Sequence, residues 1–490
     1  MPTEHRVRAF RSAAILVIAI GVLRIASTYT TFSEGIDEPI HLAAGLEMLT
    51  RHEYRLHPVN PPLPRLAFAL GPWLDGMTLD GLDPVYEHVN RVFQSGRGYL
   101  RTLAISRAGN AIFFIMAAIA TWMWARREAG DAAAIGALFF FTTQPVILGW
   151  FGLVNHDGPA VAGVAVGMLA FLRWLERPSA GRALLFGVAY GFAIACKFTC
   201  LVFIPVGCAA ILLVRRRWID WRTVAIVPVA AAVILAIVYA PFGVDKFIDG
   251  IRDVIKINND PIQAYLFGHV RTNGWWWYFP ATLALKSTLP FLLLLPAGFF
   301  VARNRVFFES LAAGVAMLVV TLPSHLDIGV RYVLPIFVPL SVAAGVVIAA
   351  LGTRHAALRV VAAVLLIWQI AESAAVHPDY FPYFNELAGR DPSRYLVDSN
   401  LDWGQDILRL SHVVQELKIG TMGVALFGNV DLDALHFPPR HRLSAFVPED
   451  GWIAISDHAY RMERGWKWLK DRPYRRVGKS IRLYSPSQLR

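Results

Sequence analysis

Residues 223–242 read TVAIVPVAAAVILAIVYAPF, a stretch without a charged side chain. Because a helix of about 20 apolar residues crosses the hydrocarbon core of a bilayer, this stretch predicts a membrane span. The whole chain has the same character, since 56% of its 490 residues are hydrophobic, only 17% are charged and its mean hydropathy is +0.45. Soluble domains are about one quarter charged, so this composition argues against an ordinary soluble protein.

Similar apolar runs recur along the chain and predict an α-helical polytopic membrane protein with about eleven spans. The candidate spans are 12–29, 107–125, 132–152, 158–175, 183–196, 198–214, 223–242, 281–302, 306–322, 331–351 and 356–376. Three cysteines, Cys196, Cys200 and Cys208, lie inside these runs. They match neither a disulfide nor a zinc pattern, so we interpret them as small hydrophobic residues.

The basic residues of the short connections predict the orientation, because lysine and arginine are retained on the cytoplasmic side. Arginines precede the first run and then occupy every second connection, at 126–127, 173–182, 215–222, 303–305 and 354–359. We therefore expect a cytoplasmic N-terminus on a signal anchor and an outer face that carries the long loop 30–106. The net charge of +11 reflects these scattered arginines, so no nucleic-acid partner is expected.

The composition changes at His377, after which no run could cross a bilayer. Residues 1–376 are thus predicted to form the transmembrane domain, and residues 377–490 a small extracytoplasmic α/β domain. Segments 422–427, 452–456 and 480–484 have the pattern of short strands, and segments 406–416 and 460–469 that of helices.

Asp37, Glu38 and His41 open the first outer loop. One interpretation is a solvated helix start, with Asp37 as N-cap and Pro39 in the first turn. The other is a general base or a divalent-cation site, for which Glu38, His41 and His156 are the candidate ligands. The following segment 56–65 is too proline-rich for one helix and is expected to lie along the membrane interface.

A second outer acid, Asp157, follows His156 in a very short turn between two spans. It is either a simple polar turn or a carboxylate that meets Asp37 or Glu38 across a shared cavity. Three cations, Lys197, Lys286 and Arg331, are predicted on the same face. Each could extend to the interface as an ordinary membrane cation, but together they suggest a phosphate site.

Two further groups of polar residues belong to the outer face. Arg271 precedes the Trp275–Tyr278 aromatic cluster, which is first of all typical of an interfacial belt. Asp398, Asp402 and Asp406 follow at intervals of four near the start of the C-terminal domain. They either cap the next helix or contribute to acceptor binding.

These segments, taken in order, resemble the bacterial GT-C glycosyltransferases of family 39 and its relatives, which include protein O-mannosyltransferases and the lipid A aminoarabinose transferase. The matching stretches are residues 37–45, 60–65, 156–157, 285–290, 328–335, 383–387 and 398–406. One departure is at 286–290, where relatives often place Thr-Pro directly after the lysine.

The resemblance implies a GT-C fold in a bacterial inner membrane, with Asp37 as the catalytic acid, Glu38 beside it and Asp157 as the second acid. It also implies a polyprenyl-phosphate-linked sugar as the donor. Lys286 and Arg331 lie in the matching motifs as phosphate-binding residues, whereas Lys197 and Arg271 are added from the predicted topology.

In the expected reaction one carboxylate takes the proton of an acceptor hydroxyl, while cations or a metal stabilise the leaving phosphate. A single displacement of this kind transfers the sugar with inversion of the anomeric centre. The acceptor is a protein, a glycolipid or a polysaccharide. A transporter or lipid flippase and a non-catalytic scaffold remain alternatives. Transporters usually place charges near the midplane and show repeated halves, neither of which is visible in this sequence.

Overall fold

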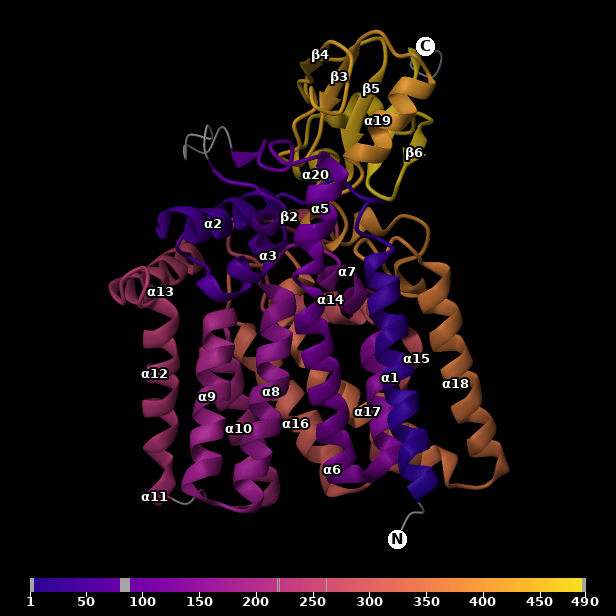
Figure 1. Ribbon diagram of the computed structural model, residues 1–490. Coiled ribbons are helices and arrows are strands. Elements are labelled where there is room, and N and C mark those ends of the chain that lie inside the picture. The colour runs from indigo at the N-terminus through magenta and orange to yellow at the C-terminus, as the bar shows by residue number, and fades with distance from the viewer. Residues whose placement is uncertain (1–3, 80–88, 218, 220, 261, 487–490) are drawn as a thin grey trace.

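The computed structural model describes residues 4–79, 89–217, 219, 221–260 and 262–486. Parts of the predicted loops 30–106 and 243–280, of the connection 215–222 and of both termini lie outside the described residues. Figure 1 shows a layer of long helices, a middle layer of short helices and loops, and a small sheet domain at the end opposite the N-terminus.

Each of the eleven predicted spans overlaps one or more helices of the long layer. These helices are α1 (Glu4–Ala26), α6 (Ala111–Thr143), α8 (Asp157–Glu176), α9 (Ala180–Cys196), α10 (Cys200–Arg215), α11 (Trp221–Val224), α12 (Ile226–Tyr239), α14 (Tyr278–Lys286), α15 (Leu289–Val301), α16 (Arg305–Thr321), α17 (Phe337–Gly352) and α18 (Ala356–Ala375). Within α6, Gly130 has a φ of 87° and joins two helices across a kink. This break falls between two of the predicted spans. Glycine can form it because it tolerates positive φ values.

Six helices among the described residues are long and apolar enough to cross a membrane. A seventh results if α14 and α15, which meet at 112°, form one broken span. Helices α9 and α10 are apolar but shorter. The chain is therefore polytopic, and the number eleven, which requires the short helices and both parts of α6, stays a prediction.

Ion pairs join the connections at one end of the helix layer. Arg215 bridges Glu128 at 2.8 Å and Glu309 at 2.7 Å, and Arg127 pairs with Glu176. This end also carries the N-terminus, whereas the sheet domain lies at the other (Figure 1). The arginine-rich connections thus share one end, as the charge pattern predicts, and the compartment that each end faces stays a prediction.

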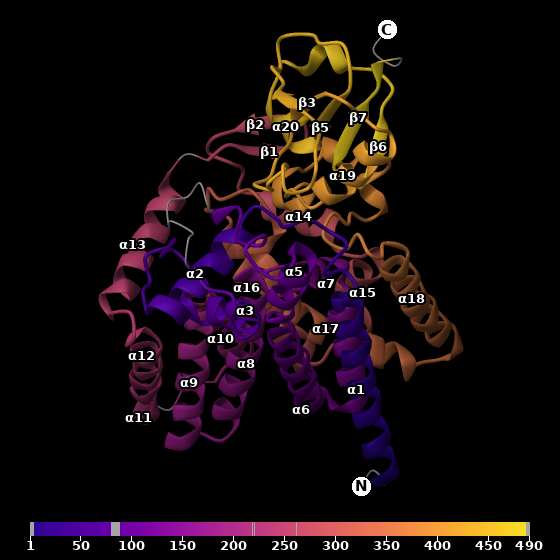
Figure 2. The ribbon, with the colours of Figure 1, turned by 45° about the horizontal axis from the view of Figure 1, so that its top comes forward.

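The middle layer consists of short elements between the spans and the sheet domain (Figure 2). They are α2 (Glu38–Arg51), α3 (Pro62–Leu74), α5 (Tyr99–Ala108), α7 (Pro145–Phe151), α13 (Asp245–Asn259), β1 (Ala264–Leu266) and β2 (His269–Arg271). The proline-rich segment 56–65 is indeed not one helix. Its last residues begin α3, since proline fits the first turn of a helix.

The C-terminal domain contains a five-stranded sheet in the order β4-β3-β5-β7-β6. The strands are β3 (Met422–Ala425), β4 (Arg440–Arg442), β5 (Ile453–Ser456), β6 (Arg475–Val477) and β7 (Ile481–Tyr484). Strand β3 is parallel to β4 and β5, and the β5-β7 and β7-β6 pairs are antiparallel. The three predicted strands coincide with β3, β5 and β7, so the small α/β unit is confirmed.

Helix α19 (Ile407–Glu416) matches the first predicted helix of this domain. The second, predicted over 460–469, is divided into α20 (Asp457–Met462) and a 3₁₀ turn (Trp466–Leu469). Residues 463–465 separate the two parts, and a Cβ atom on Gly465 would collide with Ala445.

Residues between the last span and α19 pack with the helical layer. Tyr380, Phe381 and Trp403 belong to its core, and the Trp403 ring lies 5.2 Å from that of Trp150. The core of the sheet domain begins at Ile407. The chain after residue 376 thus first covers the outer ends of the spans and only then folds as a separate layer.

All three cysteines are buried and free, as the sequence indicates.

We expect the contact between α6 and α17 to be sensitive to a single methyl group. A Cβ atom on Gly345 would collide with backbone atoms of Ala133 and Ala137, which cannot move without moving the helix. Gly345→Ala should therefore reduce stability by about 1–3 kcal/mol, the usual cost of overpacking. The matched control is Gly352→Ala, because nothing lies near its Cβ position. Equal unfolding temperatures of the two purified variants would contradict this packing.

Candidate active site

A cavity of about 550 Å³ opens where the middle layer meets the outer ends of α8, α10 and α16. It brings together side chains from seven separate segments. The polar residues that line it are Asp37, His41, His57, Asn60, His156, Asp157, Lys197, Thr199, Asn258, Asn259, Thr321, Ser324, Arg331 and Tyr332. Four of the predicted site residues, Asp37, Asp157, Lys197 and Arg331, therefore share one cavity, together with the two candidate metal ligands His41 and His156.

Asp37 and Arg331 form an ion pair in this cavity. The Arg331 Nη1 atom donates to the Asp37 Oδ2 atom at 2.7 Å, and Asp37 is 33% exposed. The guanidinium also lies 5.2 Å from the Tyr332 ring and 5.4 Å from the Trp403 ring. Asp37 is thus accessible to a ligand, while the aromatic rings hold its partner in place.

Asp157 and Lys197 form the second ion pair. Asp157 lies at the start of α8, where the Asn155 Oδ1 atom accepts hydrogen bonds from its backbone N–H at 2.9 Å and from that of Gly158 at 3.0 Å. The Lys197 Nζ atom is 4.9 Å from the Tyr332 ring. Two acid–cation pairs thus flank one tyrosine, and the predicted meeting of Asp37 and Asp157 across a cavity agrees with this geometry.

Histidines form the floor beside these pairs. The rings of His41 and His156 are 4.5 Å apart, and that of His57 lies 6.5 Å from His41. Burial and the Arg65 guanidinium lower the pKa of His57 to about 4, although Asp37 opposes this shift. Burial likewise lowers the pKa of His41. These imidazoles are therefore neutral near pH 7 and can serve as hydrogen-bond partners for an uncharged ligand.

Glu38 does not line the cavity. Its carboxylate is fully buried and accepts from the Arg107 Nε atom at 2.9 Å and the Nη2 atom at 2.6 Å. It also accepts from the backbone N–H groups of Gly35 and Val154, each at 2.7 Å. Every lone pair that a metal would need is thus already engaged. Across the described residues, no three histidine, cysteine or acidic side chains are arranged to hold a metal ion, so the set Glu38, His41 and His156 does not converge.

We expect Glu38→Gln to destabilise the protein rather than to impair its chemistry alone. Removing one partner of a buried ion pair costs about 3–5 kcal/mol, because Arg107 is left without a counter-charge. The check is the unfolding temperature in detergent, with Glu53→Gln as the control, since Glu53 forms only an exposed pair with Arg55. A normally stable Glu38→Gln protein without activity would instead assign Glu38 to the reaction.

Lys286 also lies away from the cavity. It ends α14 at the bend before α15, with 0% of its side chain exposed. Its Nζ atom donates to the backbone oxygens of Phe381, at 3.0 Å, and Asn400, and it lies 4.5 Å from the Phe384 ring. Lys286 thus binds protein carbonyls in this structure, in place of the phosphate that the motif suggests.

The contact between Lys286 and Asn400 is linked to Arg331 through the backbone that precedes it. The Asn400 Oδ1 atom accepts from the backbone N–H of Val330 at 2.9 Å, and the Ser399 hydroxyl donates to the Ile328 oxygen at 2.6 Å. A Cβ atom on Gly329 would collide with Ser399, so only glycine allows this close approach. Lys286 therefore fixes the 398–400 turn, and that turn fixes the backbone directly before Arg331.

We predict that Lys286→Met lowers the unfolding temperature in the absence of any ligand. The two carbonyls would lose their donor, and each unsatisfied buried polar group costs about 1–3 kcal/mol. The measurement is thermal unfolding of the purified variant beside Lys256→Met, a substitution on α13, where Lys256 has no comparable burial. If Lys286→Met is as stable as the wild type and loses only affinity for polyprenyl phosphate, Lys286 contacts the phosphate directly.

The remaining predicted residues lie between the cavity and the sheet domain. Asp398 is close to Arg331, and burial raises its pKa to about 6. Asp402 accepts from the His458 N–H at 3.0 Å. Asp406 accepts from the N–H groups of Lys479 and Ser480 and makes no capping bond to α19. These acids thus connect parts of the junction. Arg271 lies in a different pocket and stacks on Trp275 at 5.2 Å.

Sequence reasoning missed several residues that build the site. Arg107 reads as an ordinary arginine at the start of a span, and nothing in its spacing identifies Glu38 as its partner. Asn400 and Tyr332 do lie inside motifs that the sequence singles out. An amide between two acids and an aromatic next to an arginine are the signals that could have drawn attention to them.

Comparisons with known proteins agree with the fold. The sequence model of a family described as dolichyl-phosphate-mannose-protein mannosyltransferase matches residues 101–243. No curated protein sequence is significantly similar. Among solved structures, ArnT from Cupriavidus metallidurans in the apo state matches 98% of this chain and 99% of its own, with 14% identity and a TM-score of 0.56.

Two ligand-bound structures are similar as well. ArnT from Cupriavidus metallidurans bound to undecaprenyl phosphate matches over 97% of this chain and 98% of its own, with 14% identity and a TM-score of 0.52. The archaeal oligosaccharyltransferase AglB from Archaeoglobus fulgidus, in complex with an inhibitory peptide and a dolichol-phosphate, matches over 92% and 70%, with 13% identity and a TM-score of 0.50. The chain thus has the GT-C glycosyltransferase fold, which confirms the resemblance.

Proposed function

We propose that this protein transfers a sugar from a polyprenyl-phosphate donor to a hydroxyl acceptor at the Asp37 cavity. The observation that carries the proposal is the Asp37–Arg331 pair, an accessible carboxylate beside a cation in a largely buried site. Sugar transfer requires both groups, because a hydroxyl must lose its proton while a phosphate departs with negative charge.

One wall of the cavity suits a lipid donor. It is lined by Val202, Phe203, Val254, Ile257, Phe279, Val320 and Leu326. An apolar wall next to two cations matches an amphiphile with an isoprenoid chain and a phosphate head. The similar ArnT structure with undecaprenyl phosphate supports this assignment for the donor.

The proposed reaction is a single displacement. Asp37 takes the proton of the acceptor hydroxyl, whose oxygen forms a new bond to the anomeric carbon. The bond between that carbon and the phosphate oxygen breaks, and both of its electrons leave with the phosphate. Arg331 and Lys197 stabilise the resulting charge, and attack from the face opposite the phosphate inverts the anomeric centre.

The Asp37–Arg331 pair gives the donor a further role. While Arg331 holds Asp37, its guanidinium occupies one of the carboxylate oxygens. A donor phosphate offers Arg331 a stronger anionic partner with bidentate geometry. Donor binding then releases Asp37, so the general base becomes active only when a sugar is present.

The proposed setting is the outer face of a bacterial inner membrane, with the N-terminus in the cytoplasm and the sheet domain outside. The acceptor is a protein, glycolipid or polysaccharide hydroxyl that approaches from this outer side. Asp157 keeps Lys197 directed into the cavity and balances its charge while no donor is bound.

We expect Asp37→Asn to reduce sugar transfer by about 10²–10⁴, the usual contribution of a general base. Undecaprenyl-phosphate hexoses, pentoses and amino sugars would serve as donors, with released undecaprenyl phosphate as the readout. The unfolding temperature should remain close to that of the wild type, because Asp37 is partly exposed. Asp433→Asn, an exposed acid of the sheet domain, is the control. Unchanged turnover by Asp37→Asn would disprove the mechanism, and a wild-type protein that accepts no donor would disprove the function.

A further inference from the structure

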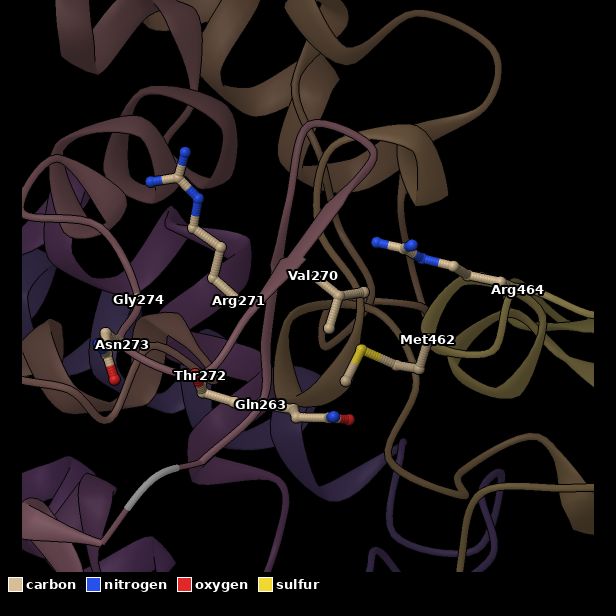
Figure 3. A pocket seen from close by; sticks show the side chains of 8 residues that line it. All are labelled: Gln263, Val270, Arg271, Thr272, Asn273, Gly274, Met462 and Arg464. Atoms are coloured by element: carbon tan, nitrogen blue, oxygen red, sulfur yellow. The ribbon is translucent and has the colours of Figure 1, made fainter.

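A second cavity, of about 600 Å³, lies at the junction of the β1-β2 hairpin and the sheet domain (Figure 3). Its lining residues are Gln263, Val270, Arg271, Thr272, Asn273, Gly274, Met462 and Arg464. Figure 3 shows Arg271 on the hairpin side and Arg464 on the side of the sheet domain, with Val270 and Met462 between them. Two arginines that are far apart in the sequence thus border one hollow.

The chemistry of this lining selects a polar, negatively charged ligand. Arg271 and Arg464 are both exposed, and none of the described residues that line the hollow carries a carboxylate. Guanidinium groups match carboxylates and phosphates with paired hydrogen bonds. The amides of Gln263 and Asn273 and the hydroxyl of Thr272 are suitable partners for sugar hydroxyls. For a lipid tail, the lining offers only two large apolar side chains, Val270 and Met462.

We propose that this cavity binds the acceptor through an acidic saccharide, a sugar that carries a carboxylate or a phosphate. This inference rests on the proposed function and adds to it the substrate class of the second reactant. It separates the two substrates in space: the donor occupies the apolar wall of the Asp37 cavity, and the acceptor arrives through the polar junction.

A small gap shares lining residues with both cavities. It is lined by Gln263 and Met462, which also border the junction cavity, and by Ile328, which also borders the Asp37 cavity. Its other lining residues are Ala264, Tyr265, Tyr278, Asp327, Val397 and Asp398. The gap is closed in this structure, so an acceptor hydroxyl reaches Asp37 only after its walls separate.

The hairpin end of the junction cavity is tied to that gap. The Asp327 Oδ2 atom accepts from the backbone N–H of Trp275 at 2.6 Å, and Asp327 also packs against Gly274. Its Oδ1 atom is buried and has no hydrogen-bond partner. A ligand that binds Arg271 and Asn273 therefore contacts the same segment that packs against Asp327 of the gap. Acceptor binding can thus move this segment and open the gap toward Asp37.

The test measures saccharide binding to the full-length protein in nanodiscs by isothermal titration. The probes are trigalacturonate and glucose 6-phosphate, with maltotriose as the neutral comparison. Vesicles that contain a glucuronosyl diacylglycerol distinguish a lipid-borne sugar from a free one. The variant is Arg271→Gln with Arg464→Gln, and the control is Lys467→Gln, an exposed cation outside the lining.

We expect an acidic probe, free or lipid-borne, to bind the wild type and the Lys467→Gln control equally, and to bind the double variant at least tenfold more weakly. The unfolding temperature of the double variant should match that of the wild type, because both side chains are exposed. Equal binding by the double variant, binding of maltotriose alone, or no binding of any acidic probe would overturn the inference. Because binding is measured without catalysis, none of these results depends on the Asp37 mechanism.

Discussion

The buried pair of Arg107 and Glu38 is the interaction on which the outer half of the molecule depends. Arg107 donates to the backbone oxygens of Tyr29, Phe32 and Ser33 as well as to Glu38. Glu38 in turn binds the N–H of Val154, just before α8. One ion pair thus joins the end of α1, the start of α2 and the approach to α8. Asp37 and Asp157 lie within a few residues of these points, so their common cavity follows from it.

The second constraint fixes Arg331. A lysine buried at the bend between α14 and α15 is costly unless its donors are satisfied. Lys286 meets this requirement by binding Phe381 and Asn400, which draws the chain after α18 back across the spans. Asn400 then positions the backbone before Arg331. Asp37 and its partner Arg331 are therefore set by two separate networks, one from the first half of the chain and one from the second.

The sequence predicts much of this arrangement and misses a specific part. Apolar runs locate the helices because burial in lipid demands them, and alternating residues locate β3, β5 and β7. Charged residues beside these runs indicate one polar face, and Asp37, Asp157, Lys197 and Arg331 do meet there. Glu38 and Lys286 belong to the same motifs, but their side chains turn inward to Arg107 and to backbone carbonyls. Adjacent positions such as Asp37 and Glu38 point in different directions at a helix start, about 100° apart, and only tertiary packing decides which one faces the cavity.

The contrast between Asp37 and Glu38 also explains how one loop combines rigidity with reactivity. Glu38 has four hydrogen bonds and no exposure, so its carboxylate is fully engaged in holding the loop. Asp37 has one ionic partner, Arg331, which in the proposed reaction binds the donor phosphate. In that reaction the exchange of partners frees the carboxylate to take the acceptor proton. The fixed acid therefore holds the loop in place so that the adjacent acid can change partners without the backbone moving.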